Sequence, residues 1–210
     1  MNRPQRVIVG ISGASGASIG LRVVELLAAA GLFEIHLIVS AGGEETLAHE
    51  IDPEALARLE GLVRERHAIG DVGACVASGS FHTAGMIVAP CSVRTLSGIA
   101  ACSAENLLLR AADVQLKERR RLVLVFRESP LHLGHIRAMA AVTEIGAILA
   151  PPAPAFYMRP QTVADVVDQI ARRSIALLGL ASVDATPEWH GLDTRTDSPL
   201  TSFPQGPCPL

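Results

Sequence analysis

Short, continuously apolar segments alternate with amphipathic segments along most of this 210-residue chain. The apolar segments are Val7–Ile11, Ile35–Val39, Met86–Ala89, Leu122–Phe126 and Ala147–Ala150. None shows the apolar–polar alternation of a strand with one face in water, so each predicts a strand that is buried on both faces. Such strands belong to parallel sheets that helices cover on both sides.

The segments between these strands carry helical periodicity. After the first strand, Ile19, Val23 and Leu27 recur at intervals of four residues. Further helices are predicted over residues 44–50, 53–66, 106–117, 132–143 and 162–178, with one more from about residue 93. This order predicts an α/β fold, a three-layer, doubly wound parallel sheet of flavodoxin-like or Rossmann-like type. A single domain is expected over residues 1–180, followed by a Pro/Ser/Thr-rich tail over 181–210.

Composition disfavours several classes of function. The formal net charge of -3 gives no electrostatic footprint for nucleic acid or anionic lipid. No apolar run approaches the roughly 20 residues that a membrane-spanning helix needs. A hydrophobic content of 49% beside only 19% charged residues predicts apolar surface between subunits, and therefore a homo-oligomer.

The cysteine pattern and the N-terminal segment favour a cytoplasmic protein. The cysteines show no CxxC spacing and no disulfide-scaffold density, so reduced thiols are expected. Arg3 and Arg6 before an apolar run superficially resemble a signal peptide. However, Gly10 and Gly13 interrupt that run, which fits a buried first strand and its loop better.

The loop after the first strand is the first candidate binding segment, because ligands of such sheets lie beyond the carboxyl ends of the strands. Its Gly13, Ala14, Ser15 and Gly16 let backbone N–H groups and a helix N-terminus approach a phosphate or a flat ring. The loop is not GxGxxG, Ser40 stands where a dinucleotide site needs a carboxylate, and GxxxxGK[ST] is absent. NAD and nucleoside triphosphate sites are therefore disfavoured, while a purely structural tight turn stays open.

Other residues near strand ends allow both a functional and a structural interpretation. The GxSxG match around Ser18 resembles a nucleophile elbow, although such a match arises easily by chance in a Gly/Ser-rich loop. Cys91 is either a thiol nucleophile or a small buried residue. His132 and His135 lack a third ligand, so a capping or core role is favoured and no metal site is expected.

Charged residues on one predicted helix and at one strand end are similarly ambiguous. Arg110, Asp113 and Lys117 could form an ion-pair ladder along a helix face. Arg127 and Glu128 directly follow a strand, and they could form a salt bridge or belong to a site at the sheet edge. Taken separately, neither pattern decides between an ion pair and a functional site.

Five long motifs lie between about Arg6 and Leu180: GISGASGA, ASGSF, PCSVRTLSGIA, LLRAADVQLKERRRLVLVFRESPLHLGHIR and EIGAILAPPAPAFYMRPQT. Together they resemble the UbiX-type flavin prenyltransferase family. The resemblance implies a flavodoxin-like fold and a dodecamer with FMN at subunit interfaces. It also implies that dimethylallyl phosphate alkylates reduced FMN without a metal, and that a UbiD-type decarboxylase receives the prenylated FMN.

The same resemblance implies the site residues, position by position. FMN would be contacted by Gly13, Ala14, Ser15, Ser40, Ser92, Val93, Arg94, Thr95 and Arg127. The prenyl phosphate would be surrounded by Arg110, Lys117, Glu128, Tyr157 and Arg173. Ser15 would hydrogen-bond the reacting edge of the flavin and relay protons. Glu128 would be the base that removes a proton on ring closure, with Glu50 as the reserve carboxylate.

Two positions depart from the family pattern, and two other functions stay open. Ala41 stands where the family often has lysine, and Ile19 where it often has tyrosine. One alternative is an FMN-dependent peptidyl-cysteine decarboxylase-like enzyme, which would need oxidised FMN and no prenyl donor. The other is a flavin-binding accessory protein for a decarboxylase, for which Ala41 and Ile19 are the sequence support.

Overall fold

The computed structural model describes residues 4–180, in which the strands form one six-stranded, fully parallel sheet. The strands are β1 (Gln5–Ile11), β2 (Phe33–Val39), β3 (Glu65–His67), β4 (Gly85–Cys91), β5 (Arg121–Phe126) and β6 (Ile148–Leu149). Their spatial order is β3-β2-β1-β4-β5-β6. The chain direction across the sheet therefore reverses between β1 and β4, where folds of this doubly wound type open a crevice for ligands.

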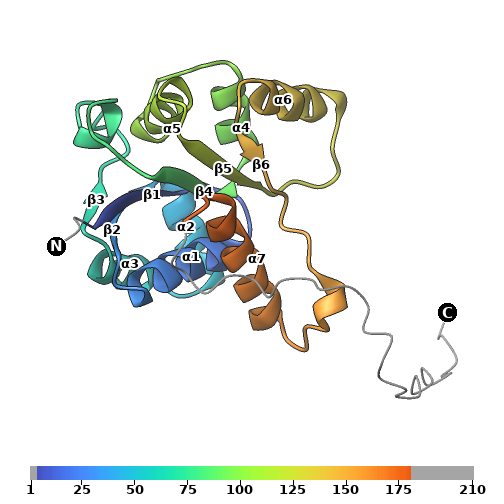
Figure 1. Ribbon diagram of the computed structural model, residues 1–210. Coiled ribbons are helices and arrows are strands. Elements are labelled where there is room, and N and C mark those ends of the chain that lie inside the picture. The colour runs from blue at the N-terminus through green and yellow to red at the C-terminus, as the bar shows by residue number, and fades with distance from the viewer. Residues whose placement is uncertain (1–3, 181–210) are drawn as a thin grey trace, which may run out of the picture.

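Helices cover both faces of the sheet (Figure 1). The helices are α1 (Ala17–Ala29), α2 (Ala41–Glu50), α3 (Ala55–Leu62), α4 (Val93–Ala100), α5 (Leu107–Lys117), α6 (Leu133–Glu144) and α7 (Val163–Leu177). Two short 3-10 turns are η1 (Cys75–Ala77) and η2 (Phe156–Met158). Figure 1 places α1, α2, α3 and α7 on one face and α4, α5 and α6 on the other. The predicted three-layer α/β fold is thus confirmed.

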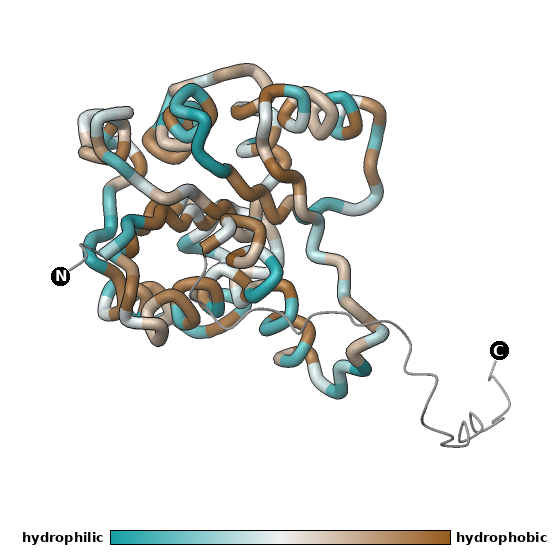
Figure 2. The backbone as a smooth tube through the Cα atoms, viewed as in Figure 1, coloured by the Kyte–Doolittle hydropathy of each residue, from teal (hydrophilic) through white to brown (hydrophobic). Residues whose placement is uncertain are grey.

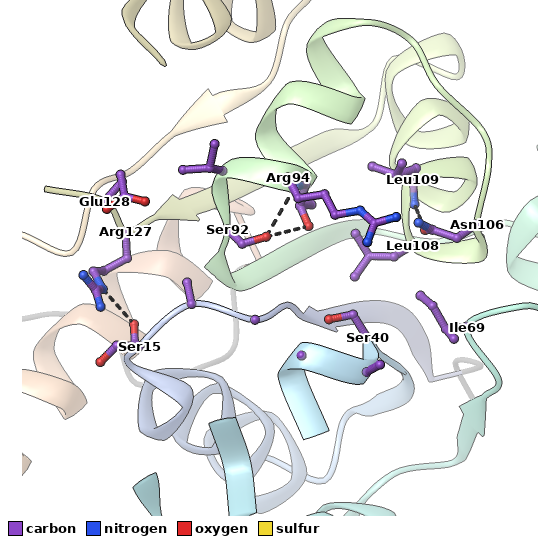
Figure 3. Close-up of a pocket in the computed structure, with 16 residues that line it drawn as sticks. Ser15, Ser40, Ile69, Ser92, Arg94, Asn106, Leu108, Leu109, Arg127 and Glu128 are labelled. Carbon is purple, nitrogen blue, oxygen red and sulfur yellow. Dashed lines mark hydrogen bonds between the residues drawn. The ribbon is translucent and has the colours of Figure 1, made fainter. Parts of the chain in front are cut away.

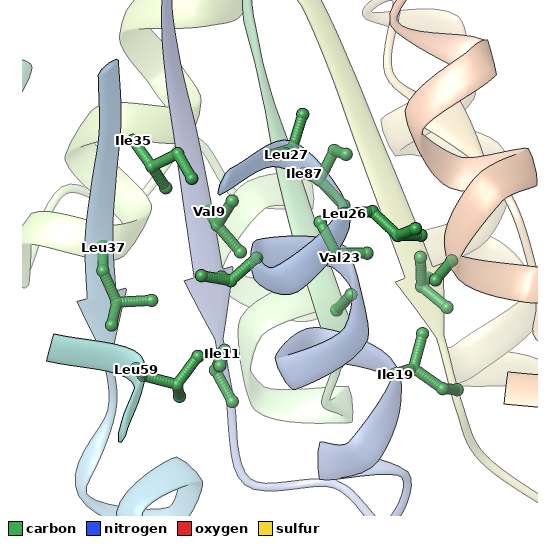
Figure 4. Close-up of a cluster of buried hydrophobic side chains, with 14 of the residues drawn as sticks. Val9, Ile11, Ile19, Val23, Leu26, Leu27, Ile35, Leu37, Leu59 and Ile87 are labelled. Atoms are coloured by element: carbon green, nitrogen blue, oxygen red, sulfur yellow. The ribbon is translucent and has the colours of Figure 1, made fainter. Parts of the chain in front are cut away.

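The core is divided into two layers by the sheet, which explains why the strands are apolar throughout. Val7 and Val9 pack with α1 and α7 in one cluster, while Ile8 packs with α4 and α5 in the other. Figure 4 shows the first cluster, where Val23 and Leu27 of α1 lie against the strands. In Figure 2 the strands form the apolar centre of the molecule. Burial on both faces leaves no position in β4, or in β1 from Val7 onward, that favours a charged residue.

One predicted helix is longer than the observed one, and one strand was not predicted. The segment 53–66 was expected to be helical, but α3 ends at Leu62 and β3 begins at Glu65. Val63 has extended backbone angles, which ends the helix. The edge strand escaped prediction because it is three residues long and two of them, Glu65 and Arg66, are charged.

Within residues 4–180, no helix combines the length and apolar character needed to span a bilayer. The tail predicted over 181–210 lies outside the described residues.

Candidate functional site

A pocket of about 630 Å³ lies at the carboxyl ends of β1, β2, β4 and β5, across the crevice between β1 and β4 (Figure 3). Its size is typical of small-molecule sites. Every residue expected to contact FMN lines it: Gly13, Ala14, Ser15, Ser40, Ser92, Val93, Arg94, Thr95 and Arg127. Glu128, expected beside the prenyl phosphate, lines the same pocket. Loops far apart in sequence therefore converge as the fold topology requires.

The pocket wall contains further residues that sequence reasoning did not select. These are Ala41, Gly42, Ile69, Asn106, Leu108 and Leu109. Ala41, one of the two departures from the family pattern, therefore lies at the pocket. Ile19, the other, is only 5% exposed and belongs to the core under α1. The side chain at this second departure therefore packs in the core and does not line the pocket.

Helices α2, α4 and α5 begin at the pocket wall, each with a capped N-terminus. Ser40 Oγ accepts a hydrogen bond from Gly43 N (3.1 Å), and Ser92 Oγ accepts one from Thr95 N (3.3 Å). Asn106 Oδ1 accepts one from Leu109 N (3.0 Å). Because helix N-termini carry partial positive charge and spare N–H groups, this wall suits an anionic group such as a phosphate.

Two glycines let the loop after β1 touch the first turn of α2. A Cβ atom on Gly13 would lie 2.9 Å from backbone carbon atoms of Gly42, which is closer than real Cβ contacts allow. Only glycine therefore fits at this backbone crossing. The absence of side chains here leaves the pocket floor open to a flat ligand.

Ser12 joins the two central loops of the pocket, although sequence reasoning missed it. Its side chain is buried, and its Oγ donates to Pro90 O (2.9 Å) while accepting from Ser92 N (2.8 Å). This bridge links the end of β1 to the end of β4, at the crevice itself. This bridge could not be predicted from the sequence because it depends on β1 and β4 being neighbours in the sheet.

Replacing Ser12 with Ala is expected to destabilise the protein by about 2 kcal/mol, because Pro90 O and Ser92 N lose a buried partner. FMN affinity should fall about tenfold as the loop carrying Ser92 loosens. Urea unfolding and quenching of flavin fluorescence at fixed protomer concentration measure the two effects. Ser97→Ala, on the exposed face of α4, is the matched control and should change neither. Wild-type behaviour of Ser12→Ala would show that the bridge does not hold the loops.

Ser15, Glu50 and Arg127 form a polar network beside the pocket. Arg127 Nε donates to Ser15 O (3.1 Å), and Glu50 Oε2 accepts from Gly16 N (2.8 Å) and Ala17 N (2.9 Å). The N-cap of α1 is Gly16, which has no side chain, so Glu50 from α2 supplies the cap. Burial alone would raise the pKa of Glu50. Hydrogen bonds from the Ser15 side chain and from the two backbone N–H groups outweigh it and lower that pKa, with help from Arg127.

The lowered pKa of Glu50 predicts a pH-dependent contribution to stability. The contribution is present above the ordinary pKa of 4.5 and is lost as pH falls through the lower folded value. Glu50→Gln should therefore lose less stability than wild type on acidification below pH 4.5, with an effect of up to about 1 kcal/mol, as for a helix cap. Urea midpoints measured from pH 7 down to pH 3 test this, with exposed Glu45→Gln on the same helix as control. Parallel pH profiles for wild type and Glu50→Gln would contradict it.

The residues expected around the prenyl phosphate are not all at this pocket. Tyr157 and Arg173 line a separate cavity of about 170 Å³ beneath the segment that follows β6. Arg110 and Lys117 line neither cavity. Arg110 donates through Nε to Ala77 O (3.2 Å) and pairs with Asp113 (2.8 Å), whereas Lys117 pairs with Glu118. One chain therefore does not gather the whole expected phosphate site.

The structure also decides between several structural and functional interpretations. Arg127 and Glu128 do not form the salt bridge considered for them in the described part of the chain: Arg127 contacts Ser15, and Glu128 accepts from Ser129 N (2.9 Å). Cys91 is fully buried, and burial raises the pKa of its thiol, so it is a core residue rather than a nucleophile.

The GxSxG match and the histidine pair have structural explanations. A Cβ on Gly20 would overlap the carbonyl oxygen of Ala89, so close packing of α1 on β4 requires this glycine. His132 caps α6 by accepting from Gly134 N (3.0 Å), and its ring lies against His135. No third side chain among residues 4–180 completes a metal-ligand group with these histidines.

Comparisons with known proteins agree with this geometry. The Flavoprotein family model matches residues 1–174. The flavin prenyltransferase UbiX of Thauera aromatica is 50% identical over 190 residues, covering 90% of this chain and 96% of that protein. The flavin prenyltransferase UbiX of Escherichia coli K12 is 46% identical over 188 residues, covering 89% of this chain and 99% of that protein.

Solved structures give the same relationship. AnUbiX (PadA1) in complex with FMN and dimethylallyl pyrophosphate superposes with a TM-score of 0.84 at 41% identity, covering 90% of this chain and 99% of that chain. A dodecameric FMN-dependent UbiX-like decarboxylase from Escherichia coli O157:H7 superposes with a TM-score of 0.83 at 41% identity, covering 90% and 100% of the two chains. The cypemycin decarboxylase CypD, at 16% identity and a TM-score of 0.58, shares the fold alone. This chain belongs to the flavoprotein family and, within it, to the UbiX-type flavin prenyltransferases.

Proposed function

We propose that this protein is a flavin prenyltransferase that transfers a dimethylallyl group to reduced FMN, giving prenylated FMN for a UbiD-type decarboxylase. The observation that carries the proposal is the convergence of all the expected FMN contacts on one pocket, in a chain 50% identical to a flavin prenyltransferase. The bond between the dimethylallyl carbon and the phosphate oxygen breaks, and phosphate leaves. The flavin nitrogen bonds to the dimethylallyl carbon as phosphate departs, and it loses its proton. The double bond of the five-carbon unit then takes up a proton at one carbon while the flavin ring carbon bonds to the other and releases its own proton.

The FMN phosphate fits the wall formed by the N-termini of α2 and α4. Ser40 and Ser92 keep these helix ends capped, and both line the pocket. The flavin ring would then lie toward Ser15, Arg127 and Glu128, which Figure 3 shows together at the other end of the pocket. Arg127 is fixed by its hydrogen bond to Ser15 O, so its guanidinium offers pre-positioned donors to the ring.

Neighbouring protomers would complete the phosphate end of the site. Arg110 and Lys117 lie on α5 away from the pocket that Glu128 lines, so a single chain leaves the leaving group without these cations. In a homo-oligomer one protomer can present them to the pocket of another. The dodecameric relative supports such an assembly. Exposed apolar side chains in the first turn of α6, including Leu133 and Ile136, are consistent with subunit contacts.

Cationic and hydroxyl donors would stabilise the departing phosphate without a metal. Arg110, Lys117, Tyr157 and Arg173 provide charge-assisted or hydroxyl hydrogen bonds that strengthen as negative charge develops. Three such bonds, each gaining about 1.5 kcal/mol, would supply about 4–5 kcal/mol, or roughly a thousandfold in rate. Arginine is suited to bidentate contact with phosphate.

Proton transfer is assigned to Glu128, Ser15 and Glu50. Closing the additional ring releases a proton from the flavin carbon, and Glu128 at the pocket wall is the base that takes it. Ser15 hydrogen-bonds Glu50, and this pair can relay a proton beside the flavin ring. The hydrogen bonds that lower the pKa of Glu50 weaken it as a base, so Glu50 stays the reserve carboxylate.

Incubating the protein with reduced FMN and dimethylallyl phosphate without oxygen should give a flavin heavier by one five-carbon unit. Mass spectrometry of the extracted flavin, with an arm containing the diphosphate donor, provides the measurement. Unmodified FMN with both donors, despite saturable FMN binding, would instead support an accessory flavin-binding protein. Decarboxylation of a peptidyl cysteine with oxidised FMN and no prenyl donor would support the decarboxylase alternative.

We also place the reaction in the cytoplasm. The cysteines within residues 4–180, Cys75, Cys91 and Cys102, are free thiols, as expected in a reducing compartment.

A further inference from the structure

A cluster of metal-ligand side chains lies at the β2–β3 edge of the sheet, outside the pocket. In the parallel pairing of these strands, His36 lies opposite Glu65 and Ile38 lies opposite His67. Because side chains alternate along a strand, His36, Glu65 and His67 project from the same face of the sheet. Cys75 opens η1 nearby. One donor atom from each of these side chains lies within 4.8 Å of the donor atoms of the others.

The two histidines are buried and already face one another. His36 Nδ1 lies 3.0 Å from His67 Nε2, and the two residues are each only 4% exposed. The Phe81 ring packs edge-on against His36, with 5.1 Å between centroids. His36 Nε2 is buried and has no hydrogen-bond partner among the described residues. The pair is therefore a polar group in an apolar setting that its present contacts do not fully satisfy.

The proton inventory of the pair is compatible with a cation between the rings. Two neutral imidazoles can share only one N–H in the 3.0 Å contact. A metal ion in that position would instead accept the lone pairs of both facing nitrogens. His67 would then carry its proton on Nδ1, which lies 3.6 Å from Glu65 Oε1. A carboxylate behind a ligating histidine is the usual arrangement that fixes the tautomer of a zinc ligand.

We propose that His36, His67 and Cys75 bind one Zn²⁺ ion, with Glu65 orienting His67. Nitrogen and thiolate donors are those that zinc prefers, and the ligand thiol releases its proton to solvent on binding. Nitrogen ligands of a tetrahedral zinc stand about 3.3 Å apart, so the two nitrogens need to separate by about 0.3 Å and the nearly parallel rings to turn until both lone pairs point at the ion. Cys75 and Glu65 are exposed and can move to close the remaining distance. The sequence did not reveal this set because its members are spread over β2, β3 and η1 and lack zinc-motif spacing.

Zinc at this position would brace one wall of the flavin pocket. It would tie β2, β3 and η1 together at the edge of the sheet. Ile69, which lines the pocket, follows His67 by two residues. Ala77, in η1, accepts the hydrogen bond from Arg110 Nε. The ion would thus hold in place both a pocket residue and the carbonyl that positions Arg110, without contacting substrate.

Cobalt(II) substitution tests the site in the full-length, tag-free protein. After chelator treatment, wild type should take up one Co²⁺ per chain and show intense visible bands with a near-ultraviolet thiolate-to-cobalt band. Cys75→Ser should lose the thiolate band and bind Zn²⁺ at least tenfold more weakly in competition with a chromophoric chelator. Glu65→Gln should weaken Zn²⁺ binding by about 10–100-fold while keeping the thiolate band. Added Zn²⁺ should displace the bound Co²⁺ and abolish its visible spectrum.

The remaining thiols provide matched controls. Cys102→Ser, at another exposed cysteine, and Cys208→Ser should keep the wild-type spectrum and affinity. Absence of Co²⁺ and Zn²⁺ uptake by wild type would overturn the proposal and leave a hydrogen-bonded histidine pair. A thiolate band that survives Cys75→Ser, or that disappears in a control variant, would also overturn it. Metal uptake by wild type alone can overturn the proposal, so the test remains decisive even if a variant misfolds.

Discussion

Glu128→Gln is expected to slow prenylation by about 10²–10⁴-fold, the range that a positioned general base contributes. Glutamine preserves size and one carbonyl oxygen but cannot accept the proton released on ring closure. FMN affinity should stay within about twofold of wild type, because Arg127 and the helix caps are untouched. Single-turnover formation of prenylated FMN under anaerobic conditions, together with flavin fluorescence titration, separates the two effects.

Glu144→Gln at the exposed end of α6 is the matched control for Glu128→Gln. It should leave both rate and FMN affinity unchanged. If Glu128→Gln instead unfolds the protein or abolishes FMN binding, Glu128 has a structural role. A wild-type prenylation rate would exclude Glu128 as the base and leave Glu50 as the candidate.

Co-assembly of two inactive variants is expected to restore activity. Lys117→Gln removes a cation from α5, and Glu128→Gln removes the base from the pocket, so each homo-oligomer should be nearly inactive. If Lys117 of one protomer serves the pocket of another, random mixed oligomers contain sites with both residues intact. Roughly a quarter of wild-type activity is then expected in a one-to-one mixture.

The complementation experiment requires the two variants to exchange subunits, which tagged co-expression and sequential affinity purification ensure. A chain carrying both substitutions, mixed with wild type, is the control for simple dilution. Activity no greater than the sum of the two inactive oligomers would show that Lys117 and Glu128 do not meet across a subunit contact. The site would then have to form within one chain, which the described geometry does not do.

The parts of the fold that were predicted from sequence are those with a local signal. Segments such as Val7–Ile11 are apolar at every position because both sheet faces are covered, and this pattern appears without knowledge of the tertiary structure. The edge strand β3 carries charged residues and pairs with one neighbour only, so its conformation is set by β2 rather than by its own sequence. The helix predicted over residues 53–66 was therefore wrongly continued across β3.

The candidate site divides in the same way. Ser15, Ser92 and Arg127 could be placed together because the ends of parallel strands meet at one edge of the sheet. Ser12 and Ile69 could not be placed at the pocket. The role of Ser12 depends on β1 and β4 being neighbours, and that of Ile69 on the path of the connection between β3 and β4. Lys117 lies outside the pocket of the single chain, so its expected role at the phosphate rests on the proposed contacts between chains, which the sequence of one chain does not order in space.

A crystal structure of the assembled protein with FMN and dimethylallyl phosphate tests the central claim most directly. FMN should lie in the pocket between the Gly13–Ser15 and Ser92–Thr95 segments, with its phosphate against the capped helix ends. The donor should lie between the flavin ring and Tyr157, Arg173 and Lys117, with one or more of these contributed by a neighbouring protomer. FMN bound outside this pocket, or a donor phosphate remote from Glu128, would contradict the proposed function.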